Sequence, residues 1–473
     1  MKVKRIIAGT LLATGIVSFG HNASAEDLWD IYQLALTNDA QYLAAAANYE
    51  AARLDLPLAK TQFRPSVTSN GTLGKQRSDF SGSNATSDNN QISLNLDLPL
   101  FDRAKRIQVD QAELQVANAE LQFFIARDDL TLRVAERYFN LLAARDAKEV
   151  ARLQKIAIKR QMDLAAERLD VGLGTRTDLF DARARFEQAN ADVIAVDILI
   201  NNSRQALIEI IAVTPESIAE LEEGSPLELP EPDNIDHWIA LATTNNLRVL
   251  SEGLNLQVAS QEIDRQRAAR HPTVNLGAAQ RWNDGSASSG FDSDDSNTSA
   301  VGLTLNLPLY LGGSINLRTK QAGMLFNSSE QALEAAKRRA QSDTTSAFLS
   351  VTSGISQVLA LEESIRAGES ALEAKAEGFS AGLTTNLDVL DAQRDLSRSK
   401  TDYLRARYNY IIALLRLEQA TGDLGDEDIQ FINKWLKENN TAYHTGDQGE
   451  PLALVLNKAP AMLSFDKAVP VSN

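Results

Sequence analysis

"VGLGTRTDLFDAR" (residues 171–183) and "AGLTTNLDVLDAQ" (residues 381–393) are two copies of one turn, and they decide the fold of this chain. Each copy reads Gly-Leu, a short threonine-containing stretch, an aspartate, two apolar residues and then Asp-Ala. The shared glycine and both aspartates recur at one constant offset, in the pairs Gly172/Gly382, Asp178/Asp388 and Asp181/Asp391. Such self-similarity predicts an internally duplicated fold.

The duplication includes strands with one apolar and one polar face. "ISLNLDLPLF" (residues 92–101) corresponds to "VGLTLNLPLY" (residues 301–310), and apolar residues alternate with small or polar ones in both. This period of two fits a half-buried strand of a soluble sandwich, and it equally fits a membrane barrel strand with lipid on one side and water on the other. Residues 78–90 and 283–299 are rich in Gly, Ser and Asp, so we predict long polar loops there.

Two very long helices favour the membrane alternative. Residues 104–170 contain neither proline nor glycine, and such a helix would be roughly 100 Å long. Its apolar residues form two stripes on nearly opposite sides of the helix, Ile107/Leu114/Leu121 and Val109/Val116/Phe123/Leu130. A helix with two seams packs between two neighbours, so we expect a wall of helices, to which residues 314–377 contribute the counterpart.

The strands of one chain are too few to close a barrel, and an open sheet edge is not tolerated in lipid. Several copies must therefore complete one barrel and one helical tube. Asp102 and Ser314 are expected to cap the two long helices. Phe101 and Tyr310, at the same junctions, fit either an aromatic belt at the membrane surface or core aromatics at a bend.

Residues 1–25 read as a secretory signal peptide, with a basic head, an apolar stretch and the small-residue cleavage site "ASA". The chain has no cysteine, which excludes disulfides and a lipid anchor on cysteine. The formal net charge of −16 argues against nucleic acid as a partner. We find no phosphate loop, metal-ligand spacing or nucleophile elbow, so we expect neither an enzyme nor a cofactor.

We divide the chain into a signal peptide (1–25), a first repeat (26–233), a second repeat (234–430) and a C-terminal tail (431–473). The Pro-rich segment "LELPEPDN" (residues 227–234) marks the joint between the repeats. Beyond a short apolar run the tail lacks any period, and we expect it to be largely disordered.

These features together resemble the TolC family of outer-membrane efflux and secretion channels, and the lack of a cysteine after the signal resembles its unlipidated branch. The resemblance rests on the tip sequences, the "LPL" strand ends and the long helices, over about residues 26–422. It implies an α+β fold: a homotrimer, with four strands per protomer, forms one membrane β-barrel continuous with a long α-helical periplasmic barrel. It also implies an exit duct in outer-membrane lipid for proteins or small molecules. Its partners would be a periplasmic adaptor protein and an inner-membrane transporter of the ABC, RND or MFS type.

The doubled turn is expected to reverse each pair of helices and to form the periplasmic mouth. Glycine permits the left-handed backbone of such a reversal, at Gly172, Gly174 and Gly382. Candidate caps for the helix that follows are Thr175 or Thr177, and Thr385 or Asn386. The resemblance implies that the adaptor docks on the tips, at Gly172, Leu173, Gly382 and Leu383. The alternative is that both leucines only pack locally.

The acids of the tips have two interpretations. Asp178 and Asp388 lie in the first turn of a helix, where the helix dipole favours a carboxylate without further purpose. Through the resemblance, Asp388 and Asp391 instead match a constricting, cation-selective ring at which divalent cations bind, although no dedicated metal site is expected. Asp178 matches a residue of the family's gate contacts. Asp181 matches no gating residue and is kept as a candidate partner.

The chain departs from the family at this gate. The best-known members have a tyrosine and an arginine where this chain has Phe379 and Thr384. Arg176, two residues before Asp178, is therefore a candidate partner for an acid of a neighbouring hairpin. Alternatives to an exit duct are an adaptor-independent outer-membrane pore or surface receptor that uses residues 78–90 and 283–299, and a structural coiled-coil protein.

Overall fold

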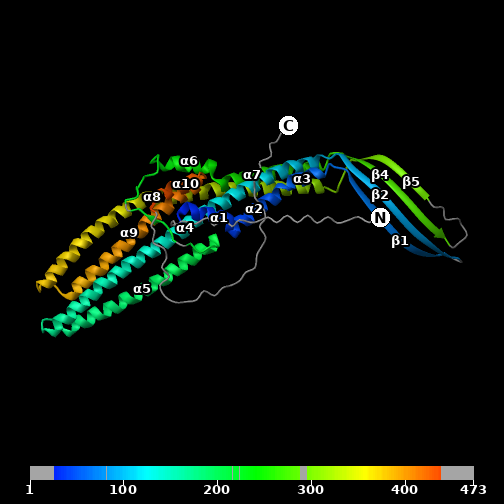
Figure 1. Ribbon diagram of the computed structural model, residues 1–473. Helices are drawn as coiled ribbons and strands as arrows, with labels where there is room; N and C mark the ends of the chain where they lie inside the picture. The colour runs from blue at the N-terminus through cyan, green and yellow to red at the C-terminus, as the bar shows by residue number, and fades with distance from the viewer. Residues whose placement is uncertain (1–25, 81–82, 216, 223, 288–295, 438–473) are drawn as a thin grey trace, which may run out of the picture.

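A computed structural model describes residues 26–80, 83–215, 217–222, 224–287 and 296–437. The predicted signal peptide and residues 438–473 of the predicted tail lie outside these ranges. The described chain is strongly elongated, with a β-sheet at one end and two helical hairpin tips at the other (Figure 1).

The two halves of the chain repeat one order of elements. The first half contains α1 (Leu28–Asn38), α2 (Ala40–Arg53), α3 (Asp55–Thr61), β1 (Ser66–Phe80), β2 (Ser83–Phe101), α4 (Arg103–Asp170) and α5 (Arg176–Ile211). The second contains α6 (Ile235–Asn245), α7 (Leu247–Ala268), β4 (Thr273–Ala287), β5 (Ser296–Asn306), α8 (Ser314–Ser380) and α9 (Asn386–Thr421). Shorter elements are β3 (Glu220–Leu221), α10 (Asp426–Asn433) and β6 (Leu436–Lys437). The predicted duplicated α+β fold is confirmed.

The long strands form one antiparallel sheet in the order β1-β2-β4-β5, so β1 and β5 are its two edges. The strands extend further than predicted. β1 ends at Phe80 and β2 begins at Ser83, while β4 ends at Ala287 and β5 begins at Ser296. The prediction of long loops at residues 78–90 and 283–299 was therefore wrong for much of their length. Ladder hydrogen bonds join backbone groups, so polar segments can continue a strand that already has a neighbour.

One face of this sheet is apolar and exposed. Val301 and Leu303 are 78% and 68% exposed, whereas Ser93 on the opposite face is 6% exposed. The only other sheet within the described residues is the β3–β6 pair, so no second layer covers the apolar face and the soluble sandwich is excluded. Phe101 and Tyr310 are 44% and 84% exposed, which contradicts the alternative that they are core aromatics.

The two long helices begin differently. Asp102 caps α4 as predicted, and its carboxylate accepts the N–H of Lys105 at 3.1 Å. The equivalent prediction for Ser314 was wrong. Gly312 and Gly313 have positive φ angles of 61° and 79° and lead straight into α8, so Ser314 is its first helical residue and no side chain caps the helix.

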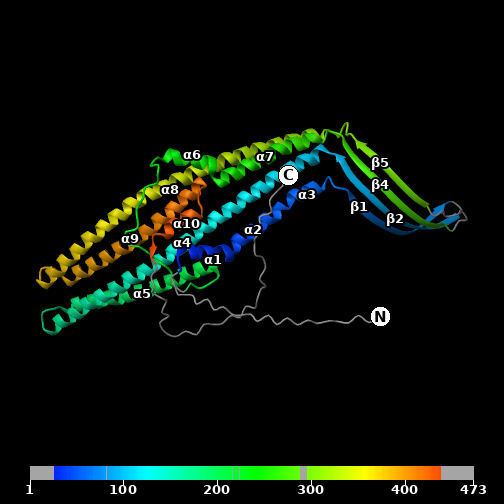
Figure 2. The same cartoon turned by 45° about the horizontal axis from the view of Figure 1, so that its top comes forward.

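The helices form a wall that runs from the sheet to the tips. α3 leads into β1, while α4, α7 and α8 each join a strand, so the helices keep the order of the strands (Figure 2). α4 packs on α2 and α3 on one side and on α7 on the other, as its two apolar stripes predict, and nearer the tip it packs on α5 and α9. Among the helices that the structure describes, none is long and apolar enough to cross a bilayer.

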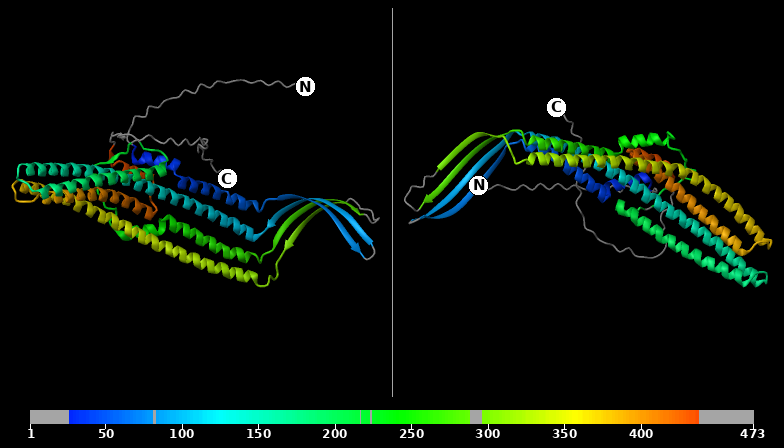
Figure 3. Two further views of the ribbon diagram at one scale, coloured as in Figure 1. Left: turned by 90° about the horizontal axis from the view of Figure 1, so that it is seen from below. Right: turned by 180° about the vertical axis from the view of Figure 1, so that it is seen from behind.

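The largest buried core lies midway along the wall. It includes Tyr138 and Phe139 of α4 and Tyr410 of α9, all at most 2% exposed. α10 packs into the same core through Ile429 and Ile432, and β6 pairs with β3. Residues 431–437, the first part of the segment that we assigned to the C-terminal tail, belong to the folded middle. Figure 3 shows the α4–α5 and α8–α9 hairpins extending together from this core to the pole opposite the sheet.

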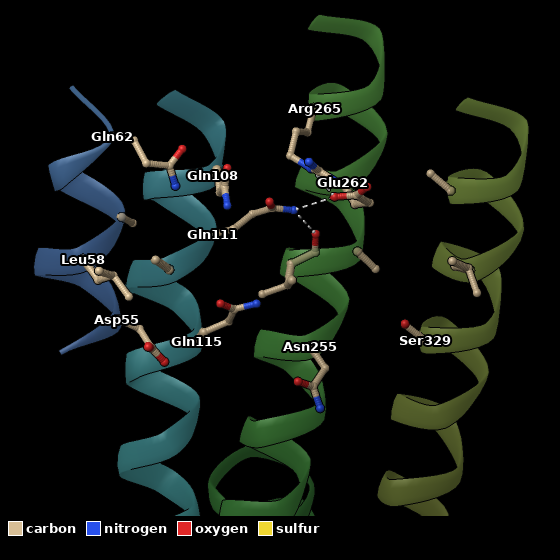
Figure 4. A pocket seen from close by; sticks show the side chains of 16 residues that line it. Asp55, Leu58, Gln62, Gln108, Gln111, Gln115, Asn255, Glu262, Arg265 and Ser329 are labelled. Atoms are coloured by element: carbon tan, nitrogen blue, oxygen red, sulfur yellow. Dashed lines mark hydrogen bonds and ion pairs between the residues drawn. The ribbon is translucent and has the colours of Figure 1, made fainter. Parts of the chain in front are cut away.

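The contact between α4 and α7 is polar near the sheet (Figure 4). The Gln111 side-chain amide donates to the Glu262 carboxylate at 3.2 Å and to the Val258 carbonyl at 3.3 Å. A hydrogen bond from Arg265 lowers the pKa of Glu262 to about 2, so this acid stays ionised. Buried polar groups that lose their partners are costly, so the seam fixes the register between the two helices.

Candidate functional site

The two hairpin tips have the same backbone geometry. Gly172 and Gly382 both have φ of 77°. In the first tip the N–H of Leu173 donates to the Arg168 carbonyl at 2.8 Å, and in the second the N–H of Leu383 donates to the Gly378 carbonyl at 2.7 Å. These are Schellman turns, which use a left-handed residue to satisfy the last carbonyls of a helix. The prediction of two equivalent helical reversals is therefore correct.

Gly174 differs from the prediction, because its φ is not positive. It is needed for space: a Cβ there would lie 3.0 Å from the Leu169 nitrogen and 3.1 Å from the Arg168 carbonyl carbon. In the second tip the small residue and the larger residue of this contact are exchanged. Thr384 stands at the position of Gly174, and a Cβ on Gly378 would lie 3.0 Å from the Thr384 Cγ2 atom. The small residue is on the turn in one tip and on the helix in the other.

Capping boxes start the returning helices. In the first tip Thr175 Oγ1 accepts the N–H of Asp178 at 3.1 Å, and the Asp178 carboxylate accepts the N–H of Thr175 at 3.2 Å. Thr385 and Asp388 form the same pair at 3.2 Å and 2.9 Å. The caps are therefore Thr175 and Thr385, and not Thr177 or Asn386. Hydrogen bonds from the hydroxyl and N–H of Thr385 lower the pKa of Asp388 below its usual value.

The second acid of each motif has a different environment in the two tips. Asp181 is exposed on α5. Asp391 lies between two guanidinium groups, with its Oδ1 atom 3.0 Å from Arg185 of the first hairpin and 3.4 Å from Arg394 of its own helix. The structure therefore brings Asp391, but not Asp181, into contact with the neighbouring hairpin.

A second contact between the hairpins involves Arg168, at the end of α4. Its guanidinium donates to the carbonyls of Phe379 and Ser380 at 3.3 Å and 3.5 Å, and its carbon lies 4.4 Å from the centre of the Phe379 ring. Arg176, the arginine singled out from the sequence, is exposed and makes no hydrogen bond or ion pair within the described part of the protomer. Sequence reasoning missed both Arg168 and Arg185.

A signal for both residues was present in the sequence, as a difference between the repeats. At the constant offset of the two turns, Arg168 corresponds to Gly378, and Arg185 corresponds to Asp395. Positions where a duplicated motif exchanges a charge for another residue mark contacts that only one copy makes.

The tip leucines do not pack locally. Leu173 and Leu383 are 80% and 83% exposed, which contradicts the local-packing alternative within the protomer. Both side chains are therefore accessible at the ends of the hairpins.

Comparison with known proteins agrees with this architecture. The sequence profile of the outer membrane efflux protein family matches residues 31–213 and 238–423. The chain belongs to the outer membrane efflux protein family. It is 31% identical to outer membrane protein TolC of Vibrio cholerae over 415 residues, which cover 87% of this chain and 94% of the relative. It is 27% identical to the proteases secretion protein PrtF of Dickeya chrysanthemi over 454 residues, 92% of this chain and 97% of that one.

Solved structures share the fold of this family member. A crystal structure of CusC has a TM-score of 0.74 at 18% identity and covers 84% of this chain and 92% of its own. The outer membrane protein VceC of Vibrio cholerae has a TM-score of 0.70 at 20% identity, covering 84% and 96%. The prediction of a TolC-type outer-membrane efflux or secretion channel is confirmed, and the protein is not an enzyme. Its place is the outer membrane, with the helical part extending into the periplasm.

Proposed function

We propose that three copies of this chain form the exit duct of a tripartite efflux pump or type I secretion system. The observation that carries the proposal is one curved sheet with two free edge strands, continuous with a wall of helices that ends in paired hairpin tips. Edges in lipid must be paired, and joining copies edge to edge closes the sheet and the wall together. A periplasmic adaptor would dock on the duct, and an inner-membrane ABC, RND or MFS transporter would supply the energy for transport.

The cargo class is proteins or small molecules. Support comes from relatives whose names describe secretion, such as the alkaline protease secretion protein AprF of Pseudomonas aeruginosa, and efflux, such as the outer membrane efflux protein BepC of Brucella suis. A water-filled tube without catalytic groups is suited to either. The alternative of a surface receptor loses support, because much of residues 78–90 and 283–299 is strand.

The tips form the proposed periplasmic mouth. In a closed ring of protomers each acid is repeated around the axis, so Asp388, Asp391 and Asp178 would give a cation-selective constriction. Asp388 stays ionised at neutral pH, because hydrogen bonds from Thr385 lower its pKa. The exposed tips at Gly172, Leu173, Gly382 and Leu383 would receive the adaptor.

Single-channel conductance in a planar bilayer tests this function. We expect a small cation-selective conductance that divalent cations block from one side only, and that Asp388→Ala/Asp391→Ala relieves. Absence of any channel would refute the duct. An unchanged block would move the constriction away from these acids. Retention of a periplasmic adaptor by the wild type but not by Leu173→Ser/Leu383→Ser would separate the duct from an adaptor-independent pore.

A further inference from the structure

The two hairpins of one protomer are joined near their tips by two arginines of the first hairpin. Arg168 lies at the end of α4, and Arg185 lies on α5. Both acceptor sites belong to the second hairpin, at the end of α8 and on α9. Phe379 and Thr384 are the positions where this chain lacks the family's hydroxyl and charge. Neither residue is a hydrogen-bond donor in these two contacts.

The Arg168 contact uses three features of its target at once. The carbonyls of Phe379 and Ser380 are among the last of α8, where no N–H of a following helical turn is available and the helix dipole favours a cation. The Phe379 carbonyl also accepts the N–H of Gly382 at 3.1 Å. The ring of Phe379 lies under the same guanidinium at 4.4 Å. A planar guanidinium can donate twice and stack simultaneously, which an ammonium group cannot do.

The Arg185 contact changes the role of Asp391. The carboxylate and both guanidinium groups are partly exposed, with side-chain exposures of 36% for Asp391, 36% for Arg185 and 51% for Arg394. Two cations at 3.0 Å and 3.4 Å offset the charge of Asp391. Within the described part of the protomer, the hydrogen bonds of Asp388 are those of its own capping box, and no cation forms an ion pair with it, so its charge remains available at the mouth.

We propose that Arg168 and Arg185 form a latch that holds the two hairpins of each protomer together and keeps the periplasmic mouth at its resting width. In this latch Asp391 is an acceptor, whereas Asp388 supplies the charge that cations meet. The inference rests on the proposed function, since it assumes that the tips close a tunnel. The latch is one-sided, because the second repeat has Gly378 and Asp395 at the equivalent positions.

Conductance of single-residue variants tests the latch. We expect Arg168→Ala to increase the open probability by roughly five- to thirtyfold, since it removes two hydrogen bonds and a cation–π contact. Arg185→Ala should increase it by roughly two- to fivefold, the effect of an exposed ion pair. Arg168→Lys should resemble Arg168→Ala, because the planar group is lost. Arg185→Ala and Asp391→Ala should not be additive, since they break one pair.

Two exposed arginines of the same hairpin are matched controls. Arg160→Ala on α4 and Arg183→Ala on α5 remove the same charge from the same hairpin without touching the second hairpin, and we expect both to behave as the wild type. If Arg168→Ala and Arg185→Ala open no more than these controls, the latch is refuted. If Asp388→Ala opens the mouth as much as Asp391→Ala, the division of roles between the two acids is refuted.

A distance measurement that needs no channel current separates failure of the latch from failure of the duct. The chain has no cysteine, so spin labels on Leu173→Cys and Leu383→Cys report the distance between the tips directly. The latch predicts a narrow distance distribution that broadens with Arg168→Ala and not with Arg183→Ala. A wild type that forms no channel would refute the duct, while this distribution still tests the latch. An unchanged distribution would refute the latch even if currents are normal.

Discussion

Asp128 is a buried acid whose charge changes near neutral pH. It lies on α4 and is 8% exposed. Burial, with the charge of Asp129 beside it, raises the pKa of Asp128 from 3.8 to about 7. The available partners bind its neighbour instead: Asp129 lies 3.5 Å from Arg248 and accepts from Gln419 at 2.9 Å. A buried carboxylate without such partners is more stable as the neutral acid.

This pKa gives stability a defined dependence on pH. From pH 3.8 to about 7 the folded protein keeps a proton at Asp128 that the unfolded chain releases, so the contribution of this residue falls as pH rises. Asp128→Asn removes this loss of unfolding free energy at high pH, which is at most about 4 kcal/mol. We expect a higher unfolding temperature at pH 8 and little change at pH 4, measured by thermal unfolding in detergent. Asp181→Asn, at an exposed site, is the control, and equal shifts of Asp128→Asn at both pH values would contradict the assignment.

At the scale of elements, the helical reversals depend on glycine for two different reasons. Gly172 and Gly382 supply a left-handed backbone with open space around them, while Gly174 supplies room against the end of α4. Alanine at Gly382 should cost roughly 1–2 kcal/mol of local strain and leave the contacts in place. Alanine at Gly174 meets backbone atoms of Leu169 and Arg168 at 3.0–3.1 Å, so the end of α4 has to move.

Hydrogen exchange distinguishes these two effects. We expect Gly382→Ala to accelerate exchange only in its own tip, by roughly five- to thirtyfold. Gly174→Ala should accelerate exchange in the first tip and also at the end of α8, because displacing Arg168 removes its hydrogen bonds to the Phe379 and Ser380 carbonyls. Exchange confined to the first tip in Gly174→Ala would show that the Arg168 contact tolerates the shift. Gly71→Ala, on an open stretch of β1, serves as a control without steric conflict.

The elements differed in how well the sequence predicted them. α4 was predicted almost to its ends, because a long run free of proline and glycine and two apolar stripes leave no other structure. α8, which contains Gly323, Gly354 and Gly368, was predicted as the counterpart of α4 in the second repeat. The strand ends were not predicted, because backbone pairing extends β1 and β2 through polar residues whose composition is typical of loops. The caps of α5 and α9 were predicted only as alternatives, since adjacent threonines and asparagine are chemically equivalent until the turn geometry is known. Arg168 and Arg185 act between segments far apart in sequence, which local patterns do not report.

At the scale of the whole molecule, the protomer is incomplete along both of its edges. β1 and β5 each have one unpaired side. Along the outer helices of the wall, Leu58 of α3 and Leu317 of α8 are 65% and 70% exposed, and Leu54, between α2 and α3, is 66% exposed. An edge-to-edge neighbour pairs the strands and buries such side chains in the same step. The sequence predicts oligomerisation from the strand number alone. The number of copies came from the family resemblance, because it depends on strand tilt and stagger, which no local pattern encodes.

Disulfide cross-linking between copies tests closure at three. Thr72 of β1 pairs with Gln91, Gln91 pairs with Asn283, and Asn283 pairs with Ser296 of β5. Thr72 and Ser296 therefore lie in one row across the sheet. We therefore fix one cysteine at Thr72 and scan the second over the polar face of β5, at Ser296, Thr298, Ala300 and Gly302. Cysteines bridge only within about 7 Å between Cα atoms, so one register should give covalent dimers and trimers and nothing larger.

The chain supplies its own controls for this experiment. It contains no native cysteine, so each single variant should migrate as a monomer on a denaturing gel. Cysteines at Val301 or Leu303 lie on the opposite, apolar face of β5, and their cross-linking to position 72 should be weak. A ladder that continues beyond three would show that the edges join without closing at a trimer. Cross-links at none of the four positions, in protein that still forms channels, would mean that the edge strands of neighbouring copies do not meet.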